Sequence, residues 1–180
     1  MNLYIGDLHF GHKNVIQFDH RPFQDVDEMD RTLIALWNDR VQQDDTVYIL
    51  GDLCYRSTKE PEWYLRQLKG HKILILGNHD GPLLKNSNVL KYLEGMEKMM
   101  RISDDNRQIT LCHFPMAEWT GFHRGTWHIY AHIHNRTDGA YQYMKNLDRA
   151  LNAGCMINYY TPVSFRELER NNKLFKEKNP

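Results

Sequence analysis

Residues 72–80 read KILILGNHD, an apolar run that ends in a short polar cluster. A continuous apolar run of this length, rich in Ile and Leu, is typical of a strand that is covered on both faces. The cluster GNHD adds a carboxamide, an imidazole and a carboxylate directly after the run. The stretch therefore predicts a buried strand over 72–76, followed by a loop that carries chemistry.

The same arrangement recurs elsewhere in the chain. Four further clusters of Asp and His come at the ends of apolar runs: Asp7-Leu8-His9, Gly51-Asp52, Cys112-His113 and Ala131-His132-Ile133-His134. Such side chains are costly to bury unless something pairs with them, so repeated clusters at strand ends indicate one shared site. Carboxylate, imidazole and carboxamide groups suit hard to borderline divalent cations better than a thiolate site would.

In chain order, the clusters D-x-H, G-D, G-N-H-D, H and H-x-H resemble the calcineurin-like metallophosphoesterase superfamily. The resemblance covers residues 7–134. Residues 7–14, together with the Arg21-Pro22-Phe23 segment, are similar to a compact prokaryotic and phage branch of phosphohydrolases. The resemblance implies a four-layer α-β-β-α sandwich with two mixed sheets, whereas the alternation of strands and helices alone predicts only an α/β fold.

The resemblance also implies a role for each polar residue of the clusters. Asp52 would bridge two divalent cations, and a hydroxide shared by them would attack phosphorus. The other ligands would be Asp7, His9 and His134 for the first cation, and Asn78, His113 and His132 for the second. Manganese is favoured, with iron, zinc, nickel and magnesium as alternatives. His79, which is not a ligand, would protonate or stabilise the leaving oxygen.

Residues 51–56 depart from the family's second motif, G-D-x-x-D-R, because Tyr55 stands where a second Asp is expected. In relatives that have this Asp, it orients the catalytic histidine. What orients His79 is therefore open, and Asp80 is one substitute. Arg56 keeps its place in the motif and, together with His12, is predicted to contact the substrate.

The periodicity of apolar residues predicts the remaining elements. Strands are expected over 1–5, 46–50, 72–76, 97–102, 108–112, 127–131 and 151–153, and helices over 26–41, 61–68 and 164–176. Ser164 and Glu167 form a capping box at the start of the last helix. His132 and His134 would point to opposite faces of a regular strand, so a loop or a distorted strand end is expected there.

Length and composition predict a single metallophosphoesterase domain over 1–180, with 41% hydrophobic residues. The formal net charge is zero, which disfavours long nucleic acid and favours a small phosphate ester or nucleotide as the partner. The three cysteines form no C-x-x-C pair, and no apolar run is long enough for a membrane span. These features predict a cytoplasmic protein without a membrane partner, and they leave its oligomeric state open.

The predicted function is a dinuclear metal-dependent phosphohydrolase that prefers phosphodiesters to phosphomonoesters. A nuclease or a protein phosphatase of the same superfamily is an alternative. The short chain and its zero net charge argue against the nuclease, and the missing second Asp argues mildly against the phosphatase. A non-catalytic metal-binding scaffold is a further alternative, which ranks below the enzyme because His79 and all seven candidate ligands are present.

Overall fold

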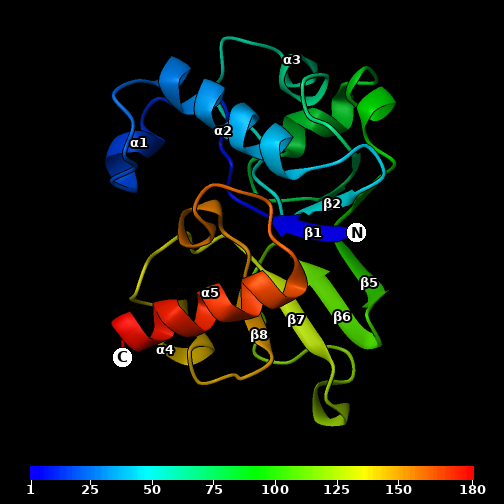
Figure 1. The fold of residues 1–180 in the computed structure, drawn as a ribbon, viewed down its shortest axis with the longest axis vertical. Coiled ribbons are helices and arrows are strands. Elements are labelled where there is room, and N and C mark those ends of the chain that lie inside the picture. Colours follow the sequence, from blue (N-terminus) through cyan, green and yellow to red (C-terminus); the bar gives the residue numbers. More distant parts are fainter.

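Two four-stranded sheets pack against each other in the computed structural model, which describes residues 1–180 (Figure 1). Apolar side chains from both sheets, among them Tyr48, Leu50, Ile109 and Ile129, form the core between them. Helices cover the outer faces. The predicted α/β fold, in α-β-β-α order, is confirmed.

The first sheet is wholly parallel, so the prediction of two mixed sheets is wrong for this one, and its strands follow one another in chain order. It consists of β1 (Asn2–Ile5), β2 (Thr46–Ile49), β3 (His71–Ile75) and β4 (Gly95–Glu97). Leu3 and Ile5 enter the core beneath the helices, while Tyr4 between them enters the core between the sheets. Because parallel strands all end at the same edge, the loops after β1, β2 and β3 emerge together.

The second sheet is mixed. It consists of β5 (Met99–Asp104), β6 (Arg107–Cys112), β7 (Trp127–Tyr130) and β8 (Ala150–Asn152). The β5–β6 pair is antiparallel and the other two pairs are parallel. Asp105 and Asn106 join β5 to β6 with φ angles of 47° and 64°, the left-handed backbone that suits a two-residue hairpin turn.

Helices form the two outer layers. On the first sheet lie α2 (Val26–Arg40) and α3 (Pro61–Leu65), and Trp37 of α2 is fully buried there. On the second sheet lies α4 (Ala140–Met144), while α5 (Phe165–Lys178) packs beside β1 and β8 (Figure 1). The short helical segments are α1 (Val15–Phe18), η1 (Gly81–Lys85), η2 (Val89–Tyr92), η3 (Phe122–Arg124) and η4 (Cys155–Asn158).

All seven predicted strands are present, with bounds within two residues of those expected. The capping box at the start of α5 is confirmed, because Ser164 and Glu167 each accept the other's backbone N–H. The prediction of a helix over 61–68 is wrong at its end: the N–H groups of Gln67 and Leu68 bond three residues back, so α3 tightens into turns after Leu65. None of the helices has the length and apolar character needed to cross a membrane.

Candidate metal centre

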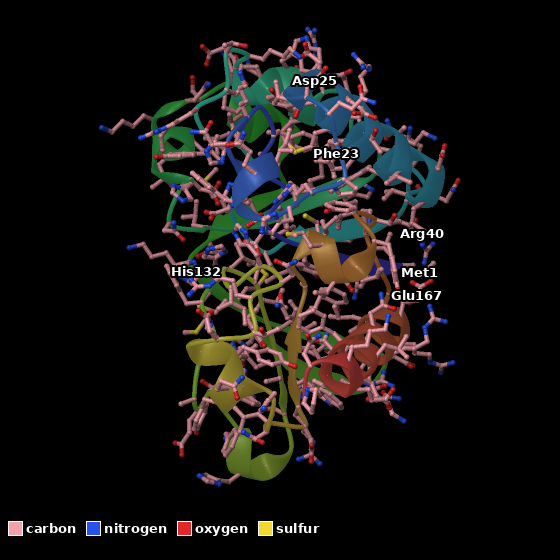
Figure 2. The ribbon with its side chains drawn as sticks, turned by 90° about the vertical axis from the view of Figure 1, so that its left-hand side faces the viewer. Met1, Phe23, Asp25, Arg40, His132 and Glu167 are labelled. Carbon is pink, nitrogen blue, oxygen red and sulfur yellow. The ribbon has the colours of Figure 1, made fainter.

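The polar clusters meet where strands from both sheets end. The loops after β1, β2 and β3 come from the first sheet, and those after β6 and β7 come from the second. These loops carry the candidate ligands Asp7, His9, Asp52, Asn78, His113, His132 and His134. Figure 2 shows His132 at mid-height on one side of the molecule, at the boundary between the two halves. The packing of the two sheets therefore brings together residues that are up to 127 positions apart in sequence.

A first donor group lies around Asp7, His9, Asp52 and His134, whose ligand atoms all fall within 4.8 Å of one another. The Nε2 atom of His9 is 3.2 Å from Nε2 of His134 and 3.5 Å from Oδ2 of Asp52. Asp7 is fully buried, and its Oδ2 has no hydrogen-bond partner. A buried carboxylate oxygen without a partner is costly, so this oxygen and its neighbours fit a cation.

A second donor group lies on the other side of Asp52. The Nε2 atom of His113 is 3.0 Å from Oδ1 of Asn78 and 3.7 Å from Oδ2 of Asp52. The Nδ1–H of His113 donates to the Leu50 carbonyl at 2.7 Å, which leaves Nε2 free to act as a ligand. The ring of His132 is 5.1 Å from that of His113, centroid to centroid. This group is more open, because Asn78 and His132 are exposed.

The backbone at the candidate ligands is unusual. Positive φ angles occur at Asp7 (54°), His9 (53°), Asp52 (53°), His132 (71°) and His134 (52°). Residues with a side chain rarely adopt this left-handed conformation, and it is concentrated at functional sites. Strand β7 ends at Tyr130, so the expected break in regular strand geometry at the two histidines is confirmed.

Burial sets the charge state of several imidazoles in the site. It lowers the pKa of His9, and the nearby charges of His134 and Arg21 lower it further. His132 is exposed as a residue, but partial desolvation of its ring and the charge of His113 lower its pKa. Metal ligation requires neutral imidazole, so both side chains are ready to bind a cation at neutral pH.

Asp19 and Arg21 support the site, although neither was predicted to be a site residue. Asp19 Oδ2 lies 2.7 Å from Nδ1 of His134, and this bond fixes which ring nitrogen of His134 faces the candidate site. Arg21 donates to Asp19 and to the backbone carbonyls of Asp7 and Leu8. Burial opposes ionisation of Asp19, but the bonds from His134 and Arg21 outweigh it and lower the pKa of Asp19. No sequence motif links Asp19 to His134.

Asp80 does not orient the imidazole of His79, so that suggestion is wrong. Both of its carboxylate oxygens accept backbone N–H groups, from Asp52, Leu53 and Gly77. Asp80 therefore fixes the two ligand-bearing loops to each other. The neighbour of the His79 ring is Tyr55, at 4.0 Å between centroids.

His79, His12 and Arg56 line a cavity of about 350 Å³. Three residues of the first donor group border the same cavity, namely His9, Asp52 and His134. His79 Nε2 is 4.0 Å from Oδ2 of Asp52. His12 is buried, and its Nδ1 has no partner. Arg56 is exposed, and its guanidinium carbon lies 5.1 Å from the centroid of Tyr55. The structure thus places the predicted site residues around one cavity, with two exceptions that do not border it. Asp7 is fully buried, and His113 lies behind Asn78.

Two proteins of known sequence are similar to this chain. An uncharacterized protein of Methanocaldococcus jannaschii is 33% identical over 162 residues, which cover 89% of this chain and 84% of that protein. The Gene 66 protein of Mycobacterium phage L5 is 42% identical over 91 residues, which cover 49% of this chain and 44% of that protein.

Among solved structures, a protein of unknown function from Aquifex aeolicus has the same fold, with a TM-score of 0.72 and 26% sequence identity. The match covers 94% of this chain and 98% of the Aquifex chain. The model of the calcineurin-like phosphoesterase family matches residues 3–146, and the chain therefore belongs to this family.

Proposed function

We propose that the protein is a phosphohydrolase that cleaves a small phosphodiester or nucleotide at a dinuclear metal site. The observation that carries the proposal is the position of Asp52 between the two donor groups. Its Oδ2 lies 3.5 Å from Nε2 of His9 and 3.7 Å from Nε2 of His113. A carboxylate shared between two sets of ligands is what a two-cation phosphoesterase requires.

The residues that would hold the cations come from both sheets. They are Asp7, His9, Asp52 and His134 for the first, and Asp52, Asn78, His113 and His132 for the second. Divalent cations bound there, with manganese favoured by the mixture of oxygen and imidazole donors, would activate water and offset negative charge on the phosphoryl oxygens.

His79 would hold the proton that the leaving oxygen needs. Its side chain is 33% exposed and borders the cavity, and its Nε2 lies close to Asp52 without belonging to the first donor group. The backbone N–H of His79 donates to Asp52 Oδ1 at 2.9 Å, which fixes the loop relative to the bridging carboxylate. The adjacent Tyr55 ring limits where the imidazole can turn. General acid catalysis needs such a positioned group.

The charge of the cavity supports a diester substrate. Arg56 is the one permanently cationic residue that borders it, and His12 beside it is kept neutral because burial lowers its pKa. A diester carries one negative charge and a monoester up to two. Apart from the proposed cations, a single guanidinium is available to the phosphate, which favours the diester. Arg56 would bind a phosphate oxygen, and His12 would accept a hydrogen bond through one ring nitrogen.

The test is hydrolysis of bis-p-nitrophenyl phosphate and p-nitrophenyl phosphate by metal-stripped protein, with and without added manganese. We expect turnover only with manganese, faster on the diester, and two manganese ions per chain. An Asp52→Ala variant purified in parallel controls for contaminating phosphatases. Binding of one ion only, or preference for the monoester, would contradict the dinuclear site or the diester preference respectively.

A further inference from the structure

An apolar hollow of about 520 Å³ lies beside the candidate metal centre, outside the cavity that contains His79. Three large apolar side chains that border it are exposed: Leu84 by 59%, Met99 by 53% and Phe114 by 44%. They come from three separate segments, namely η1, the start of β5 and the loop after β6. Apolar side chains gathered from distant segments around one hollow mark a binding surface.

The hollow is continuous with the metal centre. Asn78, a candidate ligand, borders both the hollow and the cavity of the first donor group. The Phe114 ring lies 5.0 Å from the ring of His113 and 4.7 Å from that of His132, centroid to centroid. A phosphate bound at the second donor group would therefore have this apolar surface directly next to it.

The hollow differs in chemistry from the cavity on the other side. Lys98 is its one charged residue, and no carboxylate borders it. An added Cβ at Gly81 would meet no atom within 4 Å, so the hollow is open at this point. A volume of this size accepts an aromatic ring or a short alkyl chain, and apolar pockets with few polar groups are typical small-molecule sites.

We propose that this hollow binds an aromatic or alkyl ester arm of the substrate, the arm that stays on phosphorus. The inference rests on the proposed function, and it assigns the leaving arm to the opposite cavity, because His79 borders only that one. Water adds to phosphorus and the bond to the leaving oxygen breaks. The products are an alcohol, which takes a proton, and a monoester that carries the apolar arm.

The experiment uses the manganese-loaded protein and two diesters with one leaving group: phenyl p-nitrophenyl phosphate and methyl p-nitrophenyl phosphate. In the unaltered protein, we expect kcat/KM to favour the phenyl diester by about tenfold or more, after correction for their uncatalysed rates. Leu84→Ser, which removes one wall, and Gly81→Leu, which fills the open space, should each reduce this ratio severalfold. Leu90→Ser is the matched control, because Leu90 is 57% exposed but does not border the hollow.

The outcomes separate the inference from the function on which it rests. The inference would be overturned, and the proposed function would stand, if all four proteins hydrolysed the diesters with the same phenyl-to-methyl ratio of kcat/KM. If no diester is hydrolysed, the proposed function fails, and calorimetric binding of diphenyl phosphate against dimethyl phosphate then tests the hollow directly. A dimer in sedimentation that Leu84→Ser dissociates, without any arm preference, would overturn the inference in favour of a second copy of this chain.

Discussion

The two donor groups that share Asp52 differ in burial and in support. In the first group, Asp7 is fully buried. Asp19 bonds to Nδ1 of His134, and Arg21 donates to the backbone carbonyl of Asp7. In the second group, apart from the shared Asp52, only His113 is buried and bonded to backbone, while Asn78 and His132 are exposed. On the proposed function, we infer that the first donor group mainly holds a cation and that the second also meets the substrate. We therefore expect the first group to bind manganese more tightly.

The largest expected effect comes from removing what the two groups share. Asp52→Ala should abolish stoichiometric binding of two manganese ions and lower kcat/KM by about 10³-fold or more, because both groups lose a ligand. Metal analysis and diester kinetics measure this. Asp138→Ala is the control, since Asp138 is an exposed carboxylate paired only with Arg136. Two retained ions with retained activity would remove Asp52 from its bridging role.

Replacing His79 tests whether it acts in catalysis without being a metal ligand in either donor group. His79→Ala should lower kcat by about 10²-fold, the usual contribution of a positioned general acid, while both ions stay bound. The measurement combines kcat with manganese content, and His123→Ala serves as an exposed histidine outside the cavity. Loss of an ion in the His79 variant would make this residue a ligand.

Asp19→Asn tests the carboxylate bond to His134, which has no counterpart in the second group. The change weakens the bond to Nδ1 of His134 and should reduce the affinity of the tighter manganese site by about 10–100-fold, with a smaller effect on the weaker site. Calorimetric titration measures both affinities. Thermal unfolding is followed in parallel, because Arg21 also loses a charged partner. An effect confined to the weaker site would reverse the assignment of the two groups.

The smallest expected effect concerns Tyr55, the neighbour of the His79 ring. Tyr55→Leu removes the aromatic contact and should lower kcat by about 2–10-fold, the range of an aromatic pair, without loss of metal. Tyr55→Phe keeps the ring and should retain nearly all activity. If Tyr55→Phe is as impaired as Tyr55→Leu, the hydroxyl and not the ring is what matters.

The strands and the polar clusters could be predicted from sequence because both are local. An apolar run such as 72–76 and the cluster that follows it lie in one continuous segment. By contrast, the bond from His134 to Asp19 spans 115 residues, and it depends on how two loops meet. Asp19 ends α1, a helix of four residues without an apolar periodicity to predict it. The apolar hollow could not be predicted for the same reason, because its walls come from three segments that are far apart in sequence.

The short elements were missed for a related reason. Strand β4 has three residues and pairs only with β3, so its extended form depends on its neighbour and not on its own composition.

The role of Asp80 could not be predicted from the sequence either. Its carboxylate accepts N–H groups from a loop about 27 residues earlier in the chain, and nothing in the GNHD motif distinguishes that role from contact with His79.

Five candidate ligands have left-handed backbone, so selection for activity and selection for folding stability favour different residues at these positions. Each such residue costs about 1 kcal/mol relative to glycine, which adopts this conformation freely. At an exposed position such as His132, with φ of 71°, a glycine would relieve this cost but remove a candidate ligand. A descendant released from catalysis would gain folding stability by losing its metal-binding side chains first. On the proposed function, these positions are kept for activity at a cost in folding stability.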